Sequence, residues 1–223
     1  MKHSEKEMIM ASRIIHLAII EKLKKQIDVK SINRLRLGVL LPDAYNGYDA
    51  TADSHLKINT CNGTMKTYDL NHYRNTFGEL MKKDDLYLGY YLHLIQDMAF
   101  RYFVYEKHKW NPMIPGNVEK LHNDYRLINC YVAQKYSLES EIYIPKDFEK
   151  EPINDLYRFD IVELMKNFQN DFLPYDEGDI FFFTKEMADS FIHEAVEICK
   201  KEVEAIFSGG ELMNQENGAW RRM

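Results

Sequence analysis

Apolar residues recur every three to four positions through most of this chain, which is the spacing of amphipathic and buried α-helices. Between residues 5 and 27 the apolar positions include Ile15, Ile19, Ile20 and Leu23. Such a pattern presents a wide buried face. The same spacing predicts helices over residues 5–27, 32–41, 70–83, 85–108, 117–136, 153–170 and 185–207.

Residues that favour helix ends stand at the edges of these segments. Side chains of Ser, Thr and Asp cap helix N-termini by accepting backbone N–H bonds, and Gly favours the residue just past the C-terminus. Gly209-Gly210 follows the last apolar position, so we expect the tail from about residue 211 to be loose. The predicted N-caps are Ser31, Asp69 and Thr184, and Asp84 with Asp85 is expected to start the helix that follows them.

One short stretch departs from the helical pattern. Residues 43–56 are rich in Asp, Asn, Gly and Ser and predict a loop, and residues 57–68 alternate around Asn62-Gly63, a strong hairpin signal. No internal repeat or long linker divides the chain. The sequence therefore predicts an all-α fold, a single multi-helix domain over residues 1–223 with a β-hairpin excursion near 57–68.

Composition and charge indicate which broad classes of protein this chain can belong to. The chain has 223 residues, of which 45% are apolar and 29% charged, as in a globular protein with a real core. No apolar run approaches the ~20 residues that span a bilayer, so we expect no transmembrane segment. The net charge of −6 disfavours tight nucleic-acid binding, which usually needs a basic surface.

The cysteines and the N-terminal residues indicate the cellular compartment in which the protein is expected. Cys61, Cys130 and Cys199 are widely separated, so they predict neither a disulfide framework nor a cysteine zinc site. The first residues, MKHSEKEMIMASR, lack the form of a secretory signal. Together these features predict a cytoplasmic protein.

Residues 88–103, LGYYLHLIQDMAFRYF, place two ionisable groups in an apolar helix. His93 and Asp97 are four residues apart, so they share a helix face with Cβ atoms about 5–6 Å apart. Imidazole nitrogen and carboxylate oxygen both suit zinc and similar divalent cations. The alternative is a buried hydrogen-bonded pair without a metal.

Three more polar residues stand within or beside apolar segments. His16 lies in IMASRIIHLAII, Asp43 follows LGVLLP, and His55 ends the Asp-rich loop. Taken singly, each fits an ordinary role: a core histidine on a backbone carbonyl, a turn aspartate and a surface loop histidine. Taken together with His93 and Asp97, they form the nitrogen and oxygen donor set that helical bundles use for metal sites.

The order and context of these motifs resemble the zinc-dependent phospholipase C family, which shares its fold with single-strand-specific fungal nucleases. The resemblance covers residues 10–105 approximately and is carried by ASRIIHLAI, PDA, DSH and LGYYLHLIQD. It implies that Asp43, His55, His93 and Asp97 hold one zinc ion. It also implies that His16 shares a second zinc with Asp97, which bridges the two, and that the activity is phosphoester hydrolysis.

Two further positions are candidates for the same site. His122, in LHNDY, is a candidate additional ligand with Asp124 as its orienting carboxylate; the alternative is a polar helix face. Asp53 is a candidate ligand or general base, and its alternative is a solvated loop residue. We therefore expect Asp43 and Asp53 as the catalytic carboxylates.

The function expected from these features is a metal-dependent phosphoesterase, similar to phospholipase C, that acts through a metal-activated water at a two-metal site. The expected cofactor is zinc, with two ions, although another divalent metal would suit the same ligands. The expected partner is a small phosphorylated substrate or a phospholipid headgroup. The alternative is a non-catalytic helical binding protein that a metal stabilises.

Overall fold

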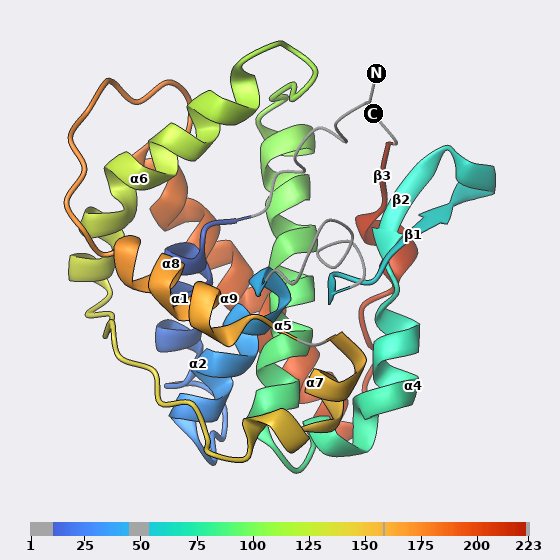
Figure 1. The fold of residues 1–223 in the computed structure, drawn as a ribbon. Coiled ribbons are helices and arrows are strands. Elements are labelled where there is room, and N and C mark those ends of the chain that lie inside the picture. The colour runs from blue at the N-terminus through green and yellow to red at the C-terminus, as the bar shows by residue number, and fades with distance from the viewer. Residues whose placement is uncertain (1–10, 45–53, 158, 222–223) are drawn as a thin grey trace, which may run out of the picture.

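The computed structural model describes residues 11–44, 54–157 and 159–221 and confirms the predicted all-α fold. Helix α5 runs through the middle, with α4 and a small sheet on one side and most other helices on the opposite side (Figure 1). The helices are α1 (Arg13–Leu23), α2 (Ile32–Leu40), α4 (Leu70–Met81), α5 (Asp85–Arg101), α6 (Asn117–Lys135), α7 (Pro152–Tyr157), α8 (Ile161–Asn170) and α9 (Lys185–Ser208). The strands are β1 (Lys57–Thr60), β2 (Met65–Tyr68) and β3 (Trp220–Arg221).

The predicted helix caps and the predicted helix start at Asp84 are confirmed. The side chains of Ser31, Asp69, Asp84 and Thr184 each accept a backbone N–H from the first turn of the helix that follows. Gly209 ends α9 in the left-handed region, at φ 78°. Local sequence therefore sets these helix boundaries.

Three helices differ from their predicted bounds. The helix predicted over 85–108 is α-helical only to Arg101 and continues as a π-helix over Tyr102–Lys107. Helix α1 begins at Arg13, not residue 5, because Ser12 is extended and its hydroxyl accepts the N–H of Ile15 at 3.3 Å; residues 5–10 lie outside the described part. The predicted helix over 153–170 is two helices, α7 and α8. Asp160 separates them, since its carboxylate caps α8 by accepting the N–H of Glu163 at 2.9 Å.

The hairpin at 57–68 is confirmed, and the C-terminal segment adds a third strand. Strands β1 and β2 pair antiparallel from Lys57↔Tyr68 to Thr60↔Met65. Strand β3 pairs with β2, and Trp220 is buried, with its ring centroid 5.0 Å from that of Tyr68. The prediction of a loose tail from residue 211 was wrong, because it overlooked this apolar contact.

The closest helix packing lies between α2 and α5, at two glycines. A Cβ on Gly38 would lie 2.1 Å from the carbonyl oxygen of Leu86, and one on Gly89 would lie 2.3 Å from that of Leu35. Any larger residue would force the helices apart. This contact brings the backbone of α2 against the middle of α5.

Helix α5 is enclosed by its neighbours. All of its residues except Ala99 are buried, and it packs against α2, α4 and α9. A polar side chain on this helix therefore needs a partner from another element. In the described ranges, no helix combines the length and apolar character needed to cross a membrane.

Candidate metal centre

Five side chains from four segments meet beside the middle of α5. His93 and Asp97 come from α5, and His16 comes from the centre of α1. Asp43 ends the 3-10 turn that follows α2, and His55 lies just before β1. The structure thus brings together five of the residues that the sequence singled out.

Their donor atoms form two overlapping groups. His16, His93 and Asp97 make one, and Asp43, His55 and His93 make the other; within each group the ligand atoms lie within 4.8 Å of one another. Asp97 faces both groups. Its Oδ1 is 3.4 Å from Nε2 of His16, and its Oδ2 is 3.8 Å and 3.7 Å from Nε2 of His55 and His93.

Asp43, at the end of the turn that follows α2, approaches the imidazoles of His55 and His93. Its Oδ1 lies 3.6 Å from Nε2 of His55 and 3.9 Å from Nε2 of His93. The side chains of the three histidines and Asp97 are fully buried, whereas that of Asp43 is 7% exposed. Asp43 therefore marks the side of the cluster nearest to solvent.

Hydrogen bonds on the far side of each ring orient the imidazoles. Nδ1 of His93 lies 2.8 Å from the Val39 carbonyl oxygen, which can only accept, so Nδ1 carries the proton and Nε2 the lone pair. Nδ1 of His16 lies 2.8 Å from Oε1 of Gln96, and Nδ1 of His55 lies 3.3 Å from the Ser54 hydroxyl. Each Nε2 is thereby turned toward the carboxylates.

This arrangement fits a divalent cation. Nε2 of His16 is buried without a hydrogen-bond partner, and Nε2 of His55 and His93 face each other at 3.1 Å. With both Nδ1 atoms protonated, two ring lone pairs and the carboxylates of Asp43 and Asp97 point at one space. A cation bound there would satisfy them all, and nitrogen with oxygen donors suits zinc.

Electrostatics keep the carboxylates ionised. Burial alone would raise the pKa of Asp43, but His93, His55 and His16 together lower it to about 2. Burial likewise opposes the charged form of Asp97, yet His93 and His16 hold its pKa well below the usual range. Both side chains are therefore anions at neutral pH.

The imidazoles differ in their affinity for protons. Burial, reinforced by the neighbouring His16, lowers the pKa of His93 to about 3, so this ring stays neutral. Burial also disfavours the charged form of His16, but Asp97 and Asp43 outweigh it and raise the pKa. In the metal-free protein His16 therefore takes up a proton more readily than His93 does.

A second layer of groups, Tyr68 and Arg101, holds Asp97. Its Oδ2 accepts the Tyr68 hydroxyl at 3.1 Å, and the Tyr68 oxygen accepts Nε of Arg101 at 3.1 Å. Lys57 is also near: burial, then the charge of Arg101, lowers its pKa to about 8. The alternating pattern of 57–68 predicted the hairpin that carries Tyr68 and Lys57 but not its position against α5.

An ion pair lies on the Asp43 side. Nε and Nη2 of Arg13 donate to the Asp171 carboxylate at 2.7 Å and 3.1 Å. Burial opposes the charge of Arg13, but Asp171 and, after it, Asp43 raise its pKa. Burial raises the pKa of Asp171 despite the opposing effect of Arg13, and Asp43 adds to the rise. This pair joins α1 to the end of α8 beside the cluster.

Two further predicted residues, His122 and Asp124, lie on α6. His122 belongs to neither donor group, and its ring lies 6.0 Å from that of Tyr125 on the same helix, α6. Asp124 is buried, and its carboxylate accepts the N–H groups of residues 181–183 at 2.7–2.8 Å, so it anchors a loop. Asp53 lies outside the described residues.

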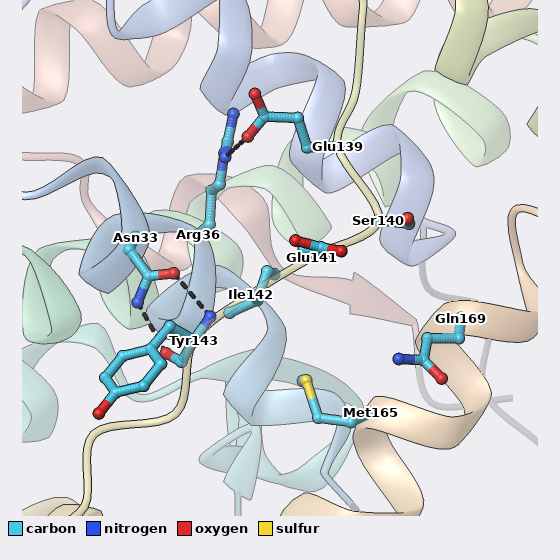
Figure 2. A pocket seen from close by; sticks show the side chains of 9 residues that line it. All are labelled: Asn33, Arg36, Glu139, Ser140, Glu141, Ile142, Tyr143, Met165 and Gln169. Carbon is cyan, nitrogen blue, oxygen red and sulfur yellow. Dashed lines mark hydrogen bonds and ion pairs between the residues drawn. The ribbon is translucent and has the colours of Figure 1, made fainter.

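A surface cavity of about 600 Å³ lies elsewhere, between α2, α8 and the segment after α6 (Figure 2). None of the residues lining it belongs to the cluster. Asn33 closes one wall by exchanging two hydrogen bonds with the backbone of Tyr143, at 2.7 Å and 2.8 Å. Arg36 is engaged by Glu139, and Figure 2 shows this contact.

No protein-family model, curated protein or solved structure matches this chain. The description of the fold and the cluster therefore rests on this chain's sequence and structure alone. They define an all-α protein with a buried histidine–aspartate cluster suited to divalent metal.

Proposed function

We propose that this protein is a metal-dependent phosphoesterase that holds two divalent ions, zinc being the first choice, in the histidine–aspartate cluster. The observation that carries the proposal is the position of Asp97, whose two oxygens face different imidazoles. One carboxylate that faces two donor groups can bridge two ions. The resemblance to zinc-dependent phospholipase C, carried by the same residues, agrees with this reading.

The reaction is hydrolysis of a phosphate ester. A water oxygen bonds to phosphorus, the bond from phosphorus to the ester oxygen breaks, and the alcohol leaves with a proton from the water. When bound, two divalent ions lower the pKa of water and neutralise charge on the phosphoryl oxygens. The substrate class is a small phosphate ester or a phospholipid headgroup.

The chain's own groups orient and hold the reactants. The Val39 carbonyl, Gln96 and the Ser54 hydroxyl fix the three rings, so their Nε2 atoms keep a set geometry. Asp43, ionised and nearest to solvent, can accept a hydrogen bond from an incoming water. We propose it as the carboxylate that orients this water.

Metal content and hydrolysis test the proposal together. Purified protein should carry about two divalent ions per chain by elemental analysis, as a two-metal site requires. It should hydrolyse p-nitrophenyl phosphate or bis(p-nitrophenyl) phosphate, and a chelator should abolish this activity. His93→Ala should lose at least one ion and the activity, while the control His193→Ala, at an exposed position of α9, should keep both. Full metal content in His93→Ala would contradict the proposal.

A non-catalytic role is the second candidate, and the burial of the cluster favours it. The side chains of His16, His55, His93 and Asp97 are 0% exposed, as in a closed structural site. The same contacts also permit a metal-free network, in which His55 donates to His93 and a protonated His16 pairs with Asp97. Under the structural role, a chelator lowers the melting temperature and no ester is turned over; under the metal-free network, a chelator changes nothing.

A further inference from the structure

Arg101 is a buried cation with unused donors. It lies one turn beyond Asp97 on α5 and is 1% exposed. Its Nε donates to the Tyr68 hydroxyl, and Tyr105 is near enough to raise its pKa together with Tyr68 and Asp97, against the effect of burial. Nη1 and Nη2 nevertheless make no hydrogen bond within normal distance and angle. Four other arginines of the described chain each direct at least one Nη atom to an oxygen: Arg13, Arg34, Arg36 and Arg74. Buried polar atoms of this kind usually have a partner, so those of Arg101 point to a ligand.

The guanidinium is held in place by aromatic rings. Cζ of Arg101 lies 4.2 Å from the ring centroid of Trp220 and 5.7 Å from that of Tyr68. Stacking fixes the plane of the guanidinium while leaving its outer donors unengaged. Because Tyr68 also donates to Asp97, the guanidinium is two hydrogen bonds from the metal cluster.

Once metal is bound, the net positive charge around Arg101 would favour the binding of an anion. Lys57 lies directly opposite Tyr68 in the hairpin, on the strand next to the tyrosine that Arg101 contacts. Among the described cluster groups, the carboxylates of Asp43 and Asp97 balance the cations of Arg101 and Lys57. Each divalent ion then adds two positive charges. The loaded cluster therefore carries an excess of positive charge that a dianion would neutralise.

We propose that Arg101, assisted by Lys57, binds the phosphoryl group of the substrate and that the substrate class is a phosphate monoester. This inference rests on the proposed function. The two Nη donors form a fork that matches two oxygens of one phosphate. A monoester has three terminal oxygens, so it can fill the fork and still present one oxygen to the metal cluster. A diester has two terminal oxygens and a single charge, so it satisfies the fork or the metals.

Calorimetric titration of the metal-loaded protein tests this with two probes, inorganic phosphate and dimethyl phosphate. Phosphate should bind the wild type more tightly than dimethyl phosphate. Arg101→Lys keeps the charge but loses the fork, so we expect phosphate binding to weaken roughly 10- to 100-fold, as for a lost charge-assisted hydrogen bond. Metal content should be unchanged. Arg74→Lys is the matched control: it changes a paired arginine that stacks on Tyr91, and phosphate binding should stay as in the wild type.

Unchanged phosphate affinity in Arg101→Lys would overturn the inference. If that variant does not fold, Lys57→Met replaces it: several-fold weaker phosphate binding supports the inference, and unchanged binding overturns it. The two proposals fail separately. If the protein hydrolyses esters but its phosphate binding does not depend on Arg101, the proposed function holds and the proposed anion site is rejected. If phosphate binding depends on Arg101 but the protein hydrolyses no ester, the proposed anion site holds and the proposed function is rejected.

Discussion

Replacing Gly89 by alanine should damage both the fold and the metal centre through one contact. The new Cβ would lie 2.3 Å from the carbonyl oxygen of Leu35 and 3.0 Å from the backbone nitrogen of Val39. Carbon and oxygen need about 3.3 Å, so α2 and α5 must separate by about 1 Å. The hydrogen bond from His93 to the Val39 carbonyl crosses this same gap and would lengthen with it.

The cost follows from these two losses. Overpacking in a well-packed core costs about 1–3 kcal/mol, and the weakened hydrogen bond adds about 1 kcal/mol. We therefore expect Gly89→Ala to lower the free energy of unfolding by about 3 kcal/mol. Metal affinity should fall roughly 10- to 100-fold, because the hydrogen bond that orients His93 is a typical second-layer contact.

Urea denaturation with chelator present measures the first effect, and competition with a chromogenic chelator measures the second. The control is Gly78→Ala on α4, where an added Cβ meets no atom within 4 Å. That variant should gain up to about 1 kcal/mol, since alanine favours the helix. Equal unfolding midpoints for the two variants would refute the packing argument, and unchanged metal affinity in Gly89→Ala would refute its link to the site.

Three further outcomes are expected. Asp124→Ala should lower the free energy of unfolding by roughly 3 kcal/mol in denaturant titrations, because it leaves the N–H groups of residues 181–183 without their acceptor. Cys199 should resist a thiol reagent at pH 8 until the protein unfolds, since burial raises its pKa to about 12; fast modification of all three cysteines would contradict this. As the pH falls from 8 to 5.5, the ion beside His16 should leave first, so elemental analysis should show the metal content per chain falling in steps and not all at once. Protons compete for this ring because its pKa is raised, whereas His93 stays neutral down to about pH 3.

Local signals predicted much of the fold. The caps at Ser31, Asp69 and Thr184 and the helix start at Asp84 were predicted correctly because each acts within one turn of its own helix. The break between α7 and α8 was missed, since the apolar spacing runs on through it. The place of Trp220 was also missed, because it depends on a distant hairpin.

The cluster could be predicted because its residues violate the apolar pattern around them. His16, His93 and Asp97 stand in the most apolar parts of their segments, and the structure brings them together. Among the supporting residues, Arg101 could be singled out as the nearest cation for a substrate phosphate, because it stands one turn beyond Asp97, although a surface ion pair would explain it equally well. Tyr68 and Lys57 gave no such signal, because a tyrosine or a lysine in a strand is ordinary. His122 was included from its sequence context, which does not say which way α6 faces.

The five metal-binding candidates all precede residue 98, while the indole that covers Arg101 is Trp220. On the ribosome, the imidazoles and carboxylates therefore emerge long before the ring that covers the guanidinium. A nascent chain can gather its cation ligands early and add this aromatic cover only after residue 220 has been synthesised.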